Sequence, residues 1–326
     1  MKKRLLIFVF ALTFLLGGGW YSFSFAQQMP YFTQFQSNDY MLNPAVTGTK
    51  GTIEALMNYR MQWVGYDGAP STSGVSLHSR FYKGKMGAGA YVMQDDIGPE
   101  RQTNFGASYA YHIRFPDCEL SAGAAGLFTK YTLIGSKMLL HNSQDPSIDQ
   151  TLTNSTYVPD ANAGFYLYND RFHIGFSALH LLKSTAHFYK NDSVKKGIIN
   201  YATHLYFSLG YNYSHNPDYI FENCAFLNYV QGTNLMLDYT LRIHYKHKIL
   251  AGFSVRLNDA LAIHVGATIL DNFEVSYSYD FLINRISNYS SGSHEIVLRY
   301  SFKTGHDGKV NGKRTKFAHQ KYSDLF

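Results

Sequence analysis

Cysteine is nearly absent from this chain, and no long apolar run follows its first residues. Only Cys118 and Cys224 occur among 326 residues, so a disulfide-rich scaffold is excluded. The two thiols either pair or stay free, and we favour no bridge. After residue 26 no stretch approaches the ~18 consecutive apolar residues of a spanning helix, which excludes a helical membrane protein. The balance of 29 basic and 23 acidic residues is too mild to indicate nucleic-acid binding.

Motifs for metal, cofactor or catalytic chemistry are also lacking. The 14 histidines are scattered and form no HExxH or CxxC arrangement. In KGKMGAGAY, the spacing of Gly84, Gly87 and Gly89 resembles a nucleotide loop only loosely, because a strand follows rather than a helix. A tight turn with small inward residues accounts for it. We therefore predict a protein that is not an enzyme and holds no cofactor and no metal.

The chain opens with a targeting segment. Basic residues at 2–4 precede an apolar run at 5–16, and Ser24-Phe25-Ala26 has the small-x-small pattern of a cleavage site. We expect residues 1–26 to be a signal peptide, so the mature protein leaves the cytoplasm. Because this segment holds three of the 29 basic residues and none of the 23 acidic ones, the mature net charge is +3.

Aromatic residues and alternating patterns are abundant. There are 27 tyrosines and 24 phenylalanines, and in EVSYSYDF the apolar Val275, Tyr277 and Tyr279 alternate with polar residues. Because strand side chains alternate between two faces, such a run has one apolar and one polar face. Aromatic residues and alternating strands in an exported protein indicate a β-barrel in the outer membrane, with lipid against its apolar face.

Alternation predicts an all-β fold, a transmembrane antiparallel up-and-down β-barrel of about 14 strands. The strands are expected at 53–63, 72–82, 85–94, 102–113, 119–130, 161–168, 171–180, 203–213, 219–230, 235–245, 249–257, 260–269, 273–281 and 294–302. The barrel then spans 51–302, between an N-terminal non-strand segment at 27–50 and a tail at 303–326.

Connection lengths support the barrel. If the first strand starts in the periplasm, every second connection is a short periplasmic turn and the others are extracellular loops. The expected turns are 83–84, 114–118, 169–170, 214–218, 246–248 and 270–272. The longer loops are 64–71, 95–101, 131–160, 181–202 and 282–293. Long connections on one side only are typical of an up-and-down barrel and not of a soluble sandwich.

Charged residues of both signs fall on the polar, inward face of these strands. They are Glu54, Arg60, Arg80, Asp238, Arg242, Arg256, Glu274, Asp280, Glu295 and Arg299. Opposite charges inside one lumen can neutralise one another. We therefore favour internal salt bridges that hold the barrel shut over a selective ion path.

Two stretches resemble the PorP/SprF family of type IX secretion proteins. The first carries Leu42-Asn43-Pro44-Ala45 with Gly48, then Tyr59-Arg60 with Gln62-Trp63, then Gly68-Ala69-Pro70. The second carries Tyr277 to Asp280 and Gly292 to Ile296. They stand in the family's order at the two ends of the mature chain. The middle, including 131–202, matches only in barrel character.

The resemblance implies a non-enzymatic outer-membrane barrel, accessory to type IX secretion and gliding motility, that supports secretion or surface anchoring of a large adhesin-like protein. It implies as partners the secreted surface adhesin or its C-terminal region, and periplasmic lipoprotein, ring or peptidoglycan-associated secretion components. Barrel size alone suggests the alternative of a porin or hydrophobic-solute transporter. Family members often end near the residue matching Phe302, so the tail at 303–326 is a departure.

Both stretches meet where the first strand pairs with the last. The candidate residues for this seam or for partner contact are Asn43, Pro44, Tyr59, Arg60, Gln62, Trp63, Asp280, Gly292, His294 and Glu295. They either lock barrel closure, which we favour, or shape a docking site. We expect Arg60 and Gln62 to face inward, Trp63 to anchor at the interface, and His294 and Glu295 to meet lumen groups.

The two ends of the mature chain are expected outside the wall. Asn43-Pro44 initiates a turn, so 27–50 should be compact, either in the barrel mouth or on the periplasmic side. The basic tail at 303–326 should lie on the same side as residue 27, because an even number of strands returns the chain to its starting side. We expect this tail to contact acidic periplasmic partners.

Overall fold

A computed structural model describes residues 30–138, 153–188, 197–231, 233, 235–270 and 272–302. The wall strands are β1 (Ile53–Met61), β2 (Ser71–Phe81), β3 (Met86–Ile97), β4 (Glu100–Arg114), β5 (Glu119–Ile134), β6 (Thr153–Tyr168), β7 (Phe172–Leu179), β10 (His204–Asn216), β11 (Tyr219–Val230), β12 (Met236–Tyr245), β13 (Ile249–Arg256), β14 (Ala260–Leu270), β15 (Phe273–Leu282) and β16 (Ser293–Phe302). The remaining elements are β8 (Thr185–Phe188), β9 (Gly197–Asn200), α2 (Asp39–Leu42), η1 (Pro44–Val46), η2 (Gly135–Lys137) and η3 (Arg285–Asn288).

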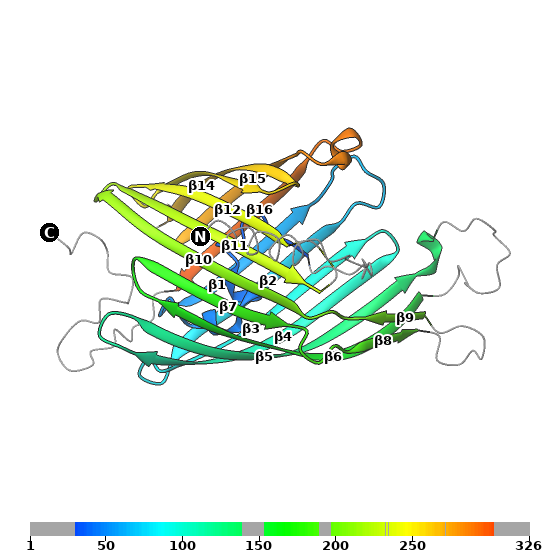
Figure 1. The fold of residues 1–326 in the computed structure, drawn as a ribbon, viewed down its shortest axis with the longest axis horizontal. Helices are drawn as coiled ribbons and strands as arrows, with labels where there is room; N and C mark the ends of the chain where they lie inside the picture. The colour runs from blue at the N-terminus through cyan, green and yellow to red at the C-terminus, as the bar shows by residue number, and fades with distance from the viewer. Residues whose placement is uncertain are drawn as a thin grey trace, which may run out of the picture.

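The 14 wall strands form one closed antiparallel barrel, in which each strand pairs with its neighbours along the chain and β1 pairs with β16. Only β8 and β9 stand apart, as a two-stranded sheet inserted between β7 and β10. Figure 1 shows this small sheet beyond one end of the wall. The predicted fold class and the pairing of the first strand with the last are confirmed.

Connections differ at the two ends of the barrel. The turn side carries 82–85, 115–118, 169–171, 217–218, 246–248 and 271–272. The loop side carries 62–70, 98–99, 135–152, 180–203, 231–235, 257–259 and 283–292, and it lies at the right in Figure 1. All six turn-side connections are short, as predicted.

Some loop boundaries were wrong. The loop expected at 95–101 shrinks to two residues, because β3 runs to Ile97 and β4 begins at Glu100. The loop expected at 131–160 is much shorter, since β5 continues to Ile134 and β6 starts at Thr153. Pro159 argues against a strand there, but β6 pairs with β7 only from Ala163 onward. A proline is tolerated at such an edge because no neighbour needs its missing N–H.

The two faces of the wall differ as the alternation requires. Val75 and Leu77 of β2, for example, are 55% and 50% exposed outward, whereas Thr72 and Ser76 are buried. Inward charges pair with one another, and examples are Arg80 with Glu119 and Arg299 with Glu274. Among the described residues, no helix is long and apolar enough to cross a membrane.

The N-terminal segment fills the lumen. Residues 30–50, with α2 and η1, are almost all buried, and they appear in blue within the barrel outline in Figure 1. Phe32, Tyr40 and Met41 pack in one apolar cluster with side chains of β3, β5 and β6, and Phe35 packs in a second with β7, β10 and β11. We call residues 30–50 the plug.

Candidate functional site

The plug crosses the lumen from the loop side to the turn side. Its Thr33 contacts Arg60 and Glu295, which lie at the loop-side ends of β1 and β16. Thr47 accepts a hydrogen bond at its carbonyl from His112 (3.0 Å), near the turn-side end of β4. The expectation of a segment in the barrel mouth or on the periplasmic side was therefore wrong. The first described residues of the plug lie at the loop side of the barrel, whereas Phe302 lies at the turn side.

Asn43 and Pro44 hold the middle of the plug in position. The Asn43 side chain accepts from the backbone N–H of Ala45 (2.9 Å) and so caps η1, while Pro44 occupies the first helical position. The Asn43 amide also donates to the carbonyl of Phe165 on β6 (3.1 Å). The Asn43 side chain thus begins η1 and ties it to the wall, which gives both residues of this candidate pair a structural role.

Glycines of the wall make room for the plug backbone. A Cβ placed on Gly87 would lie 2.2 Å from the Thr47 carbonyl oxygen, and one on Gly123 would lie 2.4 Å from the Ala45 nitrogen. A Cβ on Gly164 would lie 2.2 Å from the Asn43 Oδ1. These distances are too short for any side chain, so glycine is required there. The inward small residues of KGKMGAGAY were predicted, but the segment that they accommodate was not.

Buried ion pairs join the seam to the loop-side end of the plug. Arg60 bridges Asp280 (2.8 Å) and Glu295 (3.2 Å), and all three are almost fully buried. Arg256 bridges Asp238 at 3.3 Å. Because Arg60 is the register partner of Glu295 across β1 and β16, the predicted contact between the two family-like stretches is present. We call Arg60, Asp238, Arg256, Asp280 and Glu295 the outer clamp.

The seam continues into the loops beyond the strands. The N–H of Val64 donates to the Gly292 carbonyl (2.8 Å), and the N–H of Trp63 donates to the Ser293 hydroxyl (3.1 Å). Gly292 has φ +118, and a Cβ there would lie 2.7 Å from the Asp280 carbonyl oxygen. Glycine is therefore required, since L residues rarely adopt this conformation. Gln62 lies just after β1, with its N–H on the Pro70 carbonyl.

Two candidate residues lie on the outer face instead of in the lumen. Tyr59 is 42% exposed, and His294 accepts or donates a hydrogen bond with the Tyr277 hydroxyl (2.7 Å). The expectation that His294 meets lumen groups was wrong. Consecutive strand residues face opposite sides, so His294 points outward because Glu295 points inward. Both residues can contribute to the aromatic surface at the seam but not to the outer clamp.

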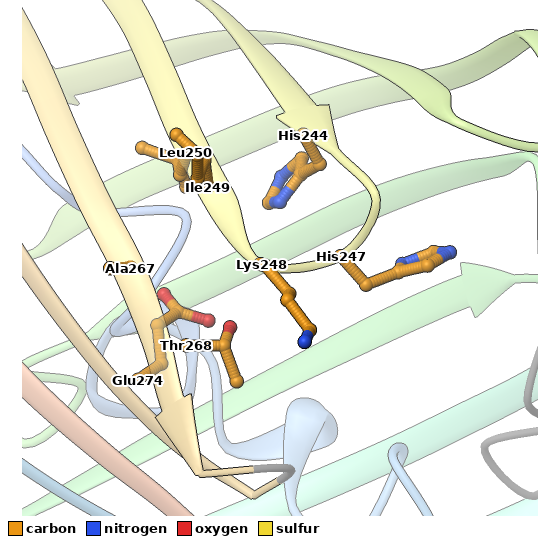
Figure 2. A pocket seen from close by; sticks show the side chains of 8 residues that line it. All are labelled: His244, His247, Lys248, Ile249, Leu250, Ala267, Thr268 and Glu274. Carbon is orange, nitrogen blue, oxygen red and sulfur yellow. The ribbon is translucent and has the colours of Figure 1, made fainter.

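Two recesses in the described part of the barrel are small. Figure 2 shows a turn-side recess lined by His244, His247, Lys248 and Glu274 among others. It and a second recess against the plug have empty volumes of about 170 and 230 Å³, below the ~300–1,000 Å³ of small-molecule pockets. Partial burial and nearby His244 lower the pKa of His247.

No arrangement for metal chemistry is found within the described ranges. No group of three His, Cys, Asp or Glu side chains could hold a metal ion there. Cys118 lies in a turn and Cys224 is buried in the lumen, and both are free, as predicted. The arrangement that remains is a filled lumen, locked by buried ion pairs at the seam.

Comparison with known proteins decides the family. A model of the type IX secretion system membrane protein family PorP/SprF matches residues 24–300. The chain belongs to the PorP/SprF family. Its membrane is the outer membrane, where such barrels place short turns in the periplasm and long loops outside. The turn side of this PorP/SprF barrel is therefore periplasmic and the loop side extracellular.

Solved structures similar to this PorP/SprF protein share its barrel fold at low sequence identity, and no curated protein matches it. The toluene transporter TbuX of Ralstonia pickettii is 13% identical with a TM-score of 0.49, covering 81% of this chain and 92% of its own. A Pseudomonas aeruginosa FadL homologue is 11% identical with a TM-score of 0.48, covering 86% and 96%. Acinetobacter baumannii Omp33 is 12% identical with a TM-score of 0.43, covering 78% and 100%.

Proposed function

We propose that this PorP/SprF protein is a non-enzymatic accessory barrel that supports secretion or surface anchoring of a large adhesin-like protein, without itself providing an open pore. The filled lumen is the observation that supports the absence of an open pore. An eight-stranded wall is filled by its own side chains, whereas a wider wall encloses extra space. Here the plug occupies that space in a 14-stranded wall.

The proposed partners lie on both sides of the membrane. The secreted adhesin, or its C-terminal region, meets the extracellular loops, which are the usual carriers of recognition on a rigid scaffold. Periplasmic lipoprotein, ring or peptidoglycan-associated components meet the turn side. The basic tail at 303–326 lies outside the described residues, and we propose it as a contact for the periplasmic partners.

Gene deletion tests this role in cells. Loss of the protein should strip a large adhesin from the cell surface and impair gliding, while other secreted proteins remain. The surface proteome of the deletion strain is compared with that of the same strain carrying the gene on a plasmid. An unchanged surface proteome would rule out the adhesin role. A general loss of secreted proteins would instead indicate a component shared by all clients.

A porin or hydrophobic-solute transporter is the second candidate. It is weakened by the plug, which contacts the wall from β1 and β16 at the seam to β6 at the far side. A stable open conductance of the purified protein would favour this candidate.

A further inference from the structure

The outer clamp holds the main chain of the plug. Backbone N–H groups of Thr33 and Gln34 both donate to the Glu295 carboxylate, at 2.7 and 3.1 Å. The side-chain amide of Gln34 also donates to the backbone carbonyl of Glu295. Residues 33–37 form a turn, and its first two N–H groups point to one carboxylate. Contacts of this kind recognise the main chain of a turn whatever its side chains are. The carboxylate is buried on a seam strand.

Two side chains of the segment are also recognised. The Thr33 hydroxyl donates to Asp280 (2.7 Å) and accepts from Arg60 (2.7 Å) and Arg256 (3.1 Å). A hydroxyl has one donor and two acceptor sites, so all of them are used. This position accordingly selects Ser or Thr.

Tyr31 is the second recognised position, two residues before Thr33. The Tyr31 hydroxyl donates to Asp238 (2.7 Å), and the Arg256 guanidinium lies 4.0 Å from the centre of its ring. The pattern that the clamp recognises is therefore an aromatic residue, any residue, and then Ser or Thr at the start of a turn.

Simple anchoring does not require this chemistry. Around Asn43 to Thr47 the plug is held by close backbone packing over wall glycines, with no ion pair. Buried charges are costly compared with apolar packing, yet five charged side chains surround Tyr31 to Gln34. The segment leaves the clamp incompletely satisfied, because Asp280 Oδ1 and Arg60 Nε are buried without hydrogen-bond partners among the described residues. Native sites usually pair such atoms.

We propose that the outer clamp is a binding site for a peptide of the form aromatic, any residue, Ser or Thr, with a turn that begins at the Ser or Thr. Tyr31 to Gln34 occupy it as an internal stand-in, with their backbone N–H groups, hydroxyl and phenol in the places of the ligand's. The clamp lies at the extracellular end of the lumen, so the ligand approaches from outside and displaces these residues. The middle of the plug stays wedged over the glycines. This site is inferred from the lumen alone and does not depend on the adhesin role.

The test uses the purified mature protein in detergent and a fluorescent peptide, PYFTQF, copied from residues 30–35. Thr33→Val in the protein keeps the side-chain size but removes the competing hydroxyl. We expect PYFTQF to bind this variant about tenfold more tightly than wild type, and a PYFVQF peptide to bind it about tenfold more weakly than PYFTQF. Adding Glu295→Gln should weaken binding, whereas Glu274→Gln, at the Arg299 pair deeper in the lumen, should not.

Two results would overturn the proposal. One is the absence of saturable binding to a Thr33→Val barrel that is folded by heat-modifiability on a gel. The other is equal binding of the two peptides. If Thr33→Val does not fold, a second experiment tests displacement of the plug. A Gln36→Cys variant is labelled with an impermeant maleimide. Excess PYFTQF should raise the labelling rate severalfold above that with PYFVQF, and unchanged labelling contradicts displacement of the plug.

Discussion

Gly123 and Gly126 lie three residues apart on β5 and face opposite sides of the wall. Gly123 faces the plug, where a Cβ would meet Pro44 and Ala45 backbone atoms within 2.5 Å, whereas a Cβ on Gly126 meets nothing within 4 Å. The same residue type therefore serves two purposes. Only at Gly123 does contact with the plug require glycine. Substituting each glycine in turn therefore separates the effect of plug contact from the effect of β-propensity.

Gly123→Val should destabilise the barrel by ~1–3 kcal/mol or more, because the added methyls meet backbone that cannot move aside. Gly126→Val should be neutral or slightly stabilising, since a β-branched residue suits a strand. The measurement is the midpoint of thermal unfolding in detergent, followed by the gel shift of the barrel. Equal midpoints for the two variants would mean that the plug does not rest on β5.

At the scale of elements, the strands could be predicted because their pattern is local. Each of the 14 wall strands lies where alternation places it, apart from shifted ends. The β8–β9 sheet was missed because its strands are short and pack on a local cluster with Tyr131 and Val158 instead of joining the wall. The start of β6 was missed because Pro159 and the polar residues around it are typical of loops.

The plug could not be placed from the sequence for a different reason. Its contacts come from strands distributed over the whole chain, such as β2 at His78 and β16 at Glu295, and no local pattern encodes them. The inward glycines of β3, β5 and β6 were the available signal. They indicated small lumen residues but not what lies against them. The inward faces of Arg60 and Asp280, and the contact of Glu295 with lumen groups, were predicted because alternation fixes the faces and the seam.

The register of β1 on β16 can be tested by cross-linking. Tyr59 lies opposite Ile296 on the outer face, and such pairs have Cα separations of ~4.5–5.5 Å, suitable for a disulfide. Tyr59→Cys with Ile296→Cys should cross-link and make the heat-denatured chain migrate faster without reductant. The matched pair Tyr59→Cys with Leu298→Cys, two residues out of register, should not. Preferential cross-linking of the second pair would show a shifted seam.

Orientation belongs to the same scale. Lys183 lies in the 180–203 loop, and Lys246 to Lys248 form a turn on the opposite side. Trypsin added to intact cells should cut near Lys183 and spare the turn, because only the loop side is exposed to the medium. Permeabilised cells provide the control, in which the turn becomes accessible. Cleavage at Lys246 to Lys248 in intact cells, with Lys183 protected, would invert the orientation.

At the scale of the whole molecule, the described residues form a closed wall around the plug, residues 30–50. The seam at which the wall closes supplies Arg60, Asp280 and Glu295, the same residues that hold Thr33. Barrel closure and lumen filling therefore depend on one set of ion pairs. A protein built in this way has little free path for solutes, which agrees with the proposed accessory role and argues against a diffusion pore.

Planar-bilayer recording tests this central claim most directly. The purified wild-type barrel should insert without a stable open conductance, because residues 30–50 fill the lumen. A variant lacking residues 31–46, checked for heat-modifiability, should conduct steadily and so show that insertion is detectable. A stable open conductance of the wild-type protein, equal to that of the deletion variant, would contradict the account.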